Sequence, residues 1–194
     1  MPPADDLFET ARVPTNVETP RLLLRTWRPE DRPAFAAINA DPAVMEHISG
    51  EPMSRSASDA LVDRIEEQWS QRGYGLYAVE LRETGEFVGF VGLNHHRALP
   101  DEVEIGWRLA RHVWGRGLAT EAARAVRDIA FETLQLPRLI SITVAANTRS
   151  LRVMEKIGLS FWREMPFERW QLVIYQGGPA DRGDTRSHAT TAAR

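Results

Sequence analysis

The chain has 194 residues, 43% of them hydrophobic, and a formal net charge of −3 at pH 7. These values suit one globular domain with a sizeable core, and the mild charge argues against nucleic-acid binding, which usually needs a basic face. No stretch approaches the roughly 20 apolar residues of a membrane helix, so no membrane partner is predicted. With no cysteine, the chain has no disulfide and no thiolate nucleophile or ligand, which fits a cytoplasmic protein.

The N-terminal third begins with an acidic, Pro-bearing segment without a signal peptide's apolar region. Residues 1–18 are predicted to form a flexible arm ahead of a domain over residues 19–176. Arg21–Trp27 is predicted as the first strand. Residues 28–41 are predicted as a short helix, because proline and acidic residues lie near its start.

A longer amphipathic helix is predicted over residues 54–73, with a Ser-rich start and Gly73 at its end. The runs 74–82 and 86–96 resemble two strands of a hairpin around the turn ETGE. The alternating run EVEIGWRLA, over residues 102–110, predicts a third strand.

The C-terminal half continues with a helix over residues 117–134 and an apolar, β-branched strand over 138–146. A helix over 148–158 and one or two strands over 160–175 follow, and residues 177–194 are predicted as a disordered tail. This order predicts a mixed α/β (α+β) sheet in one domain, with a right-handed crossover from the third strand to the next.

The turn GRGLAT, residues 115–120, joins a predicted strand to a predicted helix. Glycines let the backbone approach a ligand closely, and a helix N-terminus offers free N–H groups to a phosphate. The same pair of glycines could simply shape a strand-to-helix turn. The P-loop pattern is absent, and Thr120 stands where the dinucleotide pattern GxGxxG needs Gly or Ala.

Two longer segments carry a resemblance. EIGWRLARHVWGRGLATEAARA resembles the acetyl-CoA-binding segment of the GNAT N-acetyltransferase superfamily, whose pattern [QR]-x-x-G-x-[GA] places Trp114, Gly117 and Ala119 at its fixed positions. Trp in place of Gln or Arg is the form of the subgroup resembling ribosomal-protein alanine N-acetyltransferases. That subgroup's second motif, N-x-x-S-x-x-x-x-E-K-x-G, is matched by Asn147, Ser150, Glu155, Lys156 and Gly158. The resemblance covers about residues 18–175.

The resemblance implies a GNAT fold, with a central mixed sheet of about six to seven strands splayed at the acetyl-CoA site and about four helices. It implies direct transfer of an acetyl group from acetyl-CoA to an amine in a ternary complex, without a metal. The acceptor would be a protein N-terminus or a small-molecule amine, and the protein a monomer or homodimer. Two alternatives remain: a non-catalytic module that binds acyl-CoA, and a dinucleotide-binding protein.

The resemblance also implies which residues hold acetyl-CoA. The pyrophosphate would lie on the turn, and the pantetheine arm on the strand and on Asn147, whose simpler role is a helix N-cap. Among Arg111, Arg116, Arg149 and Arg152, only Arg116 lies inside the turn. The cofactor-binding prediction comprises Trp107, Arg108, Leu109, Trp114, Gly115, Arg116, Gly117, Leu118, Ala119, Thr120, Asn147 and Ser150.

The resemblance implies Ser150 as the general acid, since the subgroup uses this serine in place of the tyrosine of many relatives, whose position here holds Met154. Ser150 would protonate the leaving thiolate or hold a water, unless its hydroxyl only bonds a helix carbonyl. Tyr175 and Tyr77 are reserve candidates, although tyrosine is mostly a core or interface residue.

The predicted general base is Glu104, acting through water from the strand beside the acetyl site. A structural salt bridge is the simpler role, and Glu102 is a rival on the same strand face. His95 and His96 could reach the acceptor, but without a third ligand they make a poor metal site. The region of Met45, Ile48 and residues 50–53 is expected to roof the acceptor site.

Overall fold

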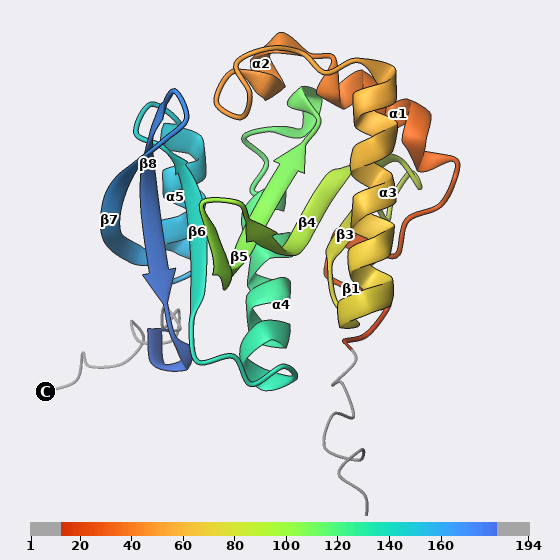
Figure 1. Cartoon of the computed structure of the whole chain (residues 1–194). Helices are drawn as coiled ribbons and strands as arrows, with labels where there is room; N and C mark the ends of the chain where they lie inside the picture. Colours follow the sequence, from red (N-terminus) through yellow and green to blue (C-terminus); the bar gives the residue numbers. More distant parts are fainter. Residues whose placement is uncertain (1–12, 182–194) are drawn as a thin grey trace, which may run out of the picture.

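A computed structural model describes residues 13–181, which contain one eight-stranded mixed sheet (Figure 1). The strands lie in the order β1-β2-β3-β4-β5-β6-β8-β7, and every neighbouring pair is antiparallel except β5 and β6. Their bounds are β1 (Asn16–Glu18), β2 (Leu22–Arg25), β3 (Leu76–Leu81), β4 (Phe87–His96), β5 (Leu99–Leu109), β6 (Leu139–Val144), β7 (Ser160–Phe167) and β8 (Trp170–Gly177).

Helices cover both faces of this sheet. Figure 1 shows α3 in front of the sheet and α4 behind it. The helices are α1 (Asp31–Asn39), α2 (Pro42–Met45), α3 (Arg55–Arg72), α4 (Leu118–Glu132) and α5 (Thr148–Lys156), with short 3-10 turns at Arg111–Val113 and Pro179–Asp181. Within residues 13–181, no helix has the length and apolar character needed to cross a bilayer.

The ends of α3 follow from local chemistry. Ser54 caps its first turn by accepting a hydrogen bond from the Ala57 N–H, and Gly73 ends it in the left-handed conformation, with φ of 71°. The helix packs over an aromatic cluster on the α1 side of the sheet, where the rings of Trp27 and Phe35 meet edge to face at 4.9 Å. This face of the sheet also forms one wall of the candidate site.

The sheet is larger than predicted at its N-terminal edge. Residues 16–18 form β1, paired with β2, although the sequence predicts them as part of the flexible arm. The domain therefore begins earlier than residue 19, because backbone pairing with β2 fixes this short segment. At the other end, Gly177 completes β8 and Pro179–Asp181 form a short turn, whereas residues 1–12 and 182–194 of the predicted arm and tail lie outside the described residues.

The parallel pair β5 and β6 separates almost at once. The two strands pair only at Glu104 and Ile140, and the Ser141 hydroxyl then donates to the Ile105 carbonyl at 2.8 Å. Figure 1 shows β5 and β6 diverging beyond this point. The sheet is therefore splayed, as the resemblance implies, and the splay exposes backbone groups of β5.

Candidate active site

A cavity of about 1140 Å³ passes through the splay between β5 and β6. One part is lined by the first turns of α4 and α5, and the other by α2 and by the turns that follow β4 and β7. Eleven of the twelve predicted cofactor-binding residues line it, as does Glu104; the exception is Arg116. The structure thus brings the two sequence motifs together around one space.

The turn before α4 holds its glycines in a left-handed conformation. Gly115 has φ of 74° and Gly117, the N-cap of α4, has φ of 78°. Side chains have room at both positions, so the backbone conformation, and not crowding, favours glycine there. The N–H groups of Leu118, Ala119 and Thr120 have no acceptor within the helix, because they belong to its first turn. They offer donors and a partial positive charge to an anion.

A hydrogen-bond network from the turn between β1 and β2 fixes the turn before α4. Glu121 accepts hydrogen bonds from the Thr19 hydroxyl at 2.7 Å and from the Arg21 side chain at 2.7 Å. The Arg21 guanidinium also donates to the Arg116 carbonyl at 2.8 Å. Burial alone would raise the pKa of Glu121, but the donors from Thr19 and Arg21 outweigh it and the pKa is lowered. The ionised Glu121 carboxylate therefore stabilises the turn, and Arg116 contributes its backbone carbonyl to the same network.

Trp114 connects the turn to β5. Its indole N–H donates to the Leu109 carbonyl at 2.8 Å, and the Arg149 guanidinium lies 4.9 Å from its ring centre. Trp114 therefore positions the end of β5 against the turn before α4 while its ring lines the cavity.

Within the splay, one residue of β5 has backbone groups that face the β6 side without a strand partner. Backbone groups alternate in direction along a strand, and the carbonyls of Ile105 and Leu109 both face the β6 side, where they meet Ser141 and Trp114. The N–H and C=O of Trp107 therefore face the same side, where β6 has already diverged. They are available to an extended ligand arm.

Helix α5 presents Asn147 and Ser150. Asn147 is its N-cap, and its side chain accepts from the Ser150 N–H at 3.2 Å, so the N-cap role is confirmed. Within residues 13–181 the Ser150 hydroxyl forms no hydrogen bond, so the carbonyl-bonded alternative is wrong and the hydroxyl remains available in the cavity. Met154 is fully buried and packs in the core.

Glu104 combines burial with position. It lies where β5 and β6 begin to separate, and only 9% of it is exposed. Burial raises the pKa of Glu104 to about 7, although the Ile142 backbone N–H and the Asn94 side chain oppose the rise. If β5 and β6 had continued to pair, this Ile142 N–H would have donated to the β5 backbone. The carboxyl group is therefore divided between its acid and base forms near neutral pH, as a general base requires.

The rival groups are engaged elsewhere. Glu102 forms an ion pair with Arg138 and does not line the cavity. Tyr77 donates its hydroxyl to the Pro14 carbonyl at 2.7 Å, and burial raises its pKa further above the neutral range. Tyr175 lies on β8 against Phe161, also away from the cavity lining. Among the carboxyl and hydroxyl candidates, Glu104 and Ser150 are the two that line the cavity.

The two histidines line the part of the cavity beside α2, which we call the acceptor part because the amine acceptor is expected there. The Nδ1 atom of His95 faces the Pro100 carbonyl at 2.9 Å, so it carries the proton, and Nε2 accepts from the Tyr74 hydroxyl at 3.0 Å. Burial and the charge of Arg97 lower the pKa of His96, with Glu168 opposing. These surroundings favour the neutral form of the His96 ring. No cluster of three or more metal-ligating side chains occurs between residues 13 and 181.

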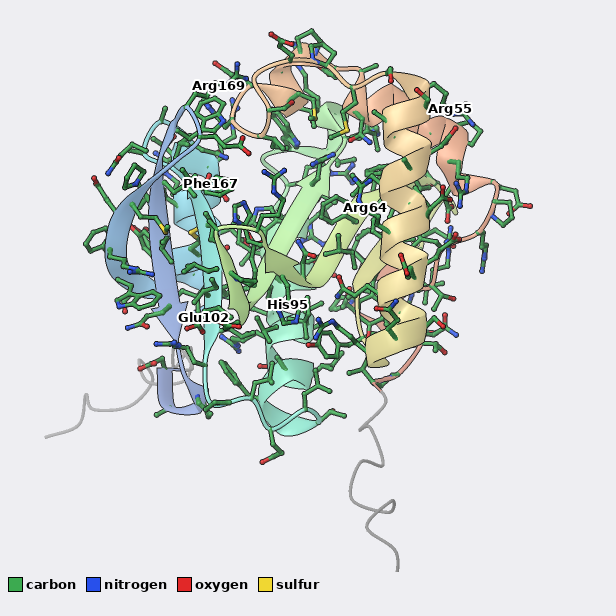
Figure 2. All side chains as sticks on the ribbon, in the orientation of Figure 1. Arg55, Arg64, His95, Glu102, Phe167 and Arg169 are labelled. Carbon is green, nitrogen blue, oxygen red and sulfur yellow. The ribbon has the colours of Figure 1, made fainter. Side chains whose placement is uncertain are left out.

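The roof of the acceptor part is only partly as predicted. Ile48 lines the cavity and is 40% exposed, but Met45 is fully buried, so its assignment to the roof is wrong. The turn after β7 supplies the rest: Arg97 pairs with Glu168 at 2.6 Å, and Figure 2 shows Arg169 at the tip of the β7–β8 hairpin. The sequence pattern did not signal this hairpin's part in the site.

The surroundings of the Arg108 side chain could not be predicted from the sequence motifs. Its position was assigned to backbone contacts with the cofactor, yet its side chain is buried against Phe35 and Phe90 on the α1 side of the sheet. Strand alternation indicates this orientation in the sequence. The side chains of residues 104, 106 and 108 share one face of β5, and that of Trp107 lies on the other face.

Comparisons with known proteins agree with this geometry. The family model of the acetyltransferase (GNAT) domain matches residues 21–160. The Bacillus subtilis protein YkkB is 32% identical over 169 residues, which are 84% of this chain and 95% of YkkB. The putative ribosomal N-acetyltransferase YdaF of the same species is 30% identical over 105 residues, or 53% of this chain and 57% of YdaF, in keeping with the subgroup that the motifs resemble.

Solved structures extend the match to the whole fold. The crystal structure of an acetyltransferase from Agrobacterium tumefaciens is 35% identical, with a TM-score of 0.76, and the match covers 85% of this chain and 94% of that one. The splayed sheet, the two motifs and these relatives lead to one conclusion. The chain belongs to the acetyltransferase (GNAT) family and is an acetyl-CoA-dependent N-acetyltransferase.

Proposed function

We propose that the protein transfers the acetyl group of acetyl-CoA to a primary amine by direct attack in a ternary complex, with Glu104 as general base and Ser150 as general acid. The observation that carries this proposal is the position of Glu104. A buried carboxyl group with a pKa of about 7 lies at the start of the splay, on the cavity that the two motifs line. A buried carboxyl group with a raised pKa on a cavity is the kind of group that catalytic sites use as a general base.

The donor is held by backbone groups. The free N–H groups of Leu118, Ala119 and Thr120 would bind the pyrophosphate, and the exposed edge of β5 would pair with the pantetheine arm. The Trp107 N–H would then polarise the thioester carbonyl and stabilise the negative charge that develops on its oxygen. One such donor is worth about 2.7–4 kcal/mol in comparable enzymes.

Two proton movements complete the reaction. Glu104 takes a proton from the acceptor ammonium, through water, so that the amine nitrogen can form the new bond to the acetyl carbon. As the carbon–sulfur bond breaks, the leaving thiolate takes a proton from the Ser150 hydroxyl or from a water held by it, and the second proton of the amine nitrogen replaces the proton given up. Without any cysteine, the chain has no thiol for an acyl-enzyme route, in agreement with direct attack.

Replacing Gly117 with Ala is expected to weaken acetyl-CoA binding by about 5- to 30-fold. A residue with a Cβ pays about 1–2 kcal/mol in the left-handed conformation, so the turn would relax away from its donor geometry. Isothermal titration calorimetry with acetyl-CoA measures the change. Gly85→Ala is the matched control, because Gly85 has φ of 71°, also has open space around it, and lies in the β3–β4 turn. Equal losses of affinity in both variants would contradict a phosphate site at Gly117.

Turnover is tested by thiol release from acetyl-CoA over a panel of N-terminal peptides, amino acids, polyamines and drug-like amines. Acetylation of one class supports the proposal and identifies the acceptor. Tight binding of acetyl-CoA without turnover on any amine would favour the alternative role of an acyl-CoA-binding module.

A further inference from the structure

Three arginines are buried among residues 13–181, and two of them have a carboxylate partner. Arg25, 3% exposed, forms ion pairs with Asp31 at 2.7 Å and Glu80 at 2.9 Å. Arg127 pairs with Asp128 at 2.8 Å and also donates to a backbone carbonyl. Arg108, 9% exposed, forms no ion pair with any carboxylate among residues 13–181. A buried charge without a counter-charge is costly, so this exception calls for a functional reason.

The surroundings hold the Arg108 guanidinium in place without neutralising it. Its Nη1 donates to the Asn39 side-chain oxygen at 2.6 Å, and the Asn39 amide in turn donates to the Ser58 hydroxyl at 2.9 Å. The rings of Phe35 and Phe90 lie 5.8 and 5.3 Å from the guanidinium carbon, and Nε has no partner. Burial lowers the pKa of Arg108 to about 10, so it remains a cation at neutral pH.

Arg108 lies on the same face of β5 as Glu104. Gly106 stands between them, and a Cβ placed there would meet no atom within 4 Å. All three residues line the cavity. Because Gly106 has no side chain, a ligand can approach the β5 backbone between Glu104 and Arg108. Four residues of extended strand separate the two Cα atoms by about 13 Å.

We propose that Arg108 binds a carboxylate of the acceptor, so that the protein acetylates amines that carry a carboxylate at the far end of a short chain. This inference rests on the proposed function, since it places the reacting amine near Glu104. The planar guanidinium matches a carboxylate, and the aromatic walls strengthen the interaction by excluding water.

The other charges of the acceptor part agree with an anionic substrate. Arg97 is already paired with Glu168, whereas Arg169 lies over Trp170, 5.1 Å from its ring centre, and forms no ion pair within residues 13–181. Arg108 and Arg169 together would repel a polyamine. The structure therefore favours amino carboxylates over polyamines.

The test is a comparison of matched acceptors: glycine, β-alanine, 4-aminobutanoate and 6-aminohexanoate, each against its own carboxamide, with spermidine as the polyamine. For the chain length that fits best, kcat/KM for the carboxylate is expected to exceed that for the amide by about 10- to 100-fold, the worth of one charge-assisted hydrogen bond. A preference for the amides or for spermidine would overturn the proposal.

Variants separate recognition from folding. Arg108→Met should reduce the carboxylate-to-amide ratio to within about twofold of one, through a higher KM for the carboxylate, while Arg108→Lys should restore part of it. Arg97→Met, which removes an exposed cavity arginine already paired with Glu168, should keep the ratio. Arg108→Met should also lower the melting temperature less than Arg25→Met, which breaks two ion pairs. An unchanged ratio in Arg108→Met would refute the role of Arg108.

A failure of this inference differs from a failure of the proposed function. If no amine in the panel is acetylated, the proposed function fails, and 6-aminohexanoate is then titrated into the CoA-loaded protein to test the site alone. Binding that Arg108→Met weakens at least tenfold would retain the carboxylate site, and equal binding to both proteins, or to neither, would reject it.

Discussion

Glu104→Gln is expected to lower kcat/KM by about 10²- to 10⁴-fold at pH 8, the usual worth of a positioned general base. The substitution keeps the size of the side chain and its place beside Ile142 and Asn94 but removes the group that accepts the proton. Steady-state thiol release with the best acceptor measures the loss. Glu102→Gln is the matched control on the same strand, because Glu102 is paired with Arg138 and lies outside the cavity lining.

The pH dependence gives a second readout for the same variant. Burial raises the pKa of Glu104 to about 7, so the base form grows as the pH rises through 7. The kcat/KM of the unmodified protein should therefore rise across this window, and Glu104→Gln should lose that limb of the profile. A variant that keeps both the limb and the rate would contradict the role of Glu104.

The stability of the folded protein should fall as the pH rises through 7, whereas the activity should rise. The carboxyl group has a higher pKa folded, about 7, than its ordinary value of 4.5, so the folded state binds the proton more tightly. This contribution is fully present below pH 4.5 and is lost as the pH rises through 7, a change of about 3 kcal/mol. Glu104→Gln should therefore be more stable than the unmodified protein at pH 8, as measured by urea unfolding. Activity lost together with stability at pH 8 would point to a structural role.

Ser150→Ala is expected to lower kcat by about 10²-fold while leaving acetyl-CoA affinity within about twofold. The hydroxyl has no partner among the described residues, and the Ser150 backbone N–H keeps its bond to Asn147, so the helix cap is preserved. Stopped-flow single turnover separates this chemical step from product release. Ser70→Ala, on the exposed side of α3, is the control, and a kcat within twofold of the original in Ser150→Ala would remove Ser150 from the mechanism.

The donor side of the site was predictable because its determinants are local. Gly115 and Gly117 adopt left-handed conformations that glycine favours, the helix that follows begins at the next residue, and Asn147 caps α5 within four residues of Ser150. Such features depend on a few neighbouring residues, so a motif of fixed spacing describes them completely.

The acceptor side depends on contacts between distant segments. Arg108 meets Asn39 across 69 positions, and Arg97 meets Glu168 across 71. Strand alternation indicates which face of β5 carries Arg108, but not that the opposing helix supplies no carboxylate. The burial of Glu104, which sets its pKa, likewise depends on how β4 and β6 close around it. The short strand β1 was missed because its pairing with β2, and not its own composition, defines it.

The central claim is that the splay between β5 and β6 binds acetyl-CoA and presents its acetyl group to an amine at Glu104. Titration calorimetry with acetyl-CoA, followed by thiol release in the presence of amino carboxylates, tests it most directly. Acetyl-CoA binding is expected that Gly117→Ala weakens and Glu104→Gln leaves intact, together with turnover that Glu104→Gln lowers by about 10²- to 10⁴-fold. Absence of acetyl-CoA binding by the unmodified protein would contradict it.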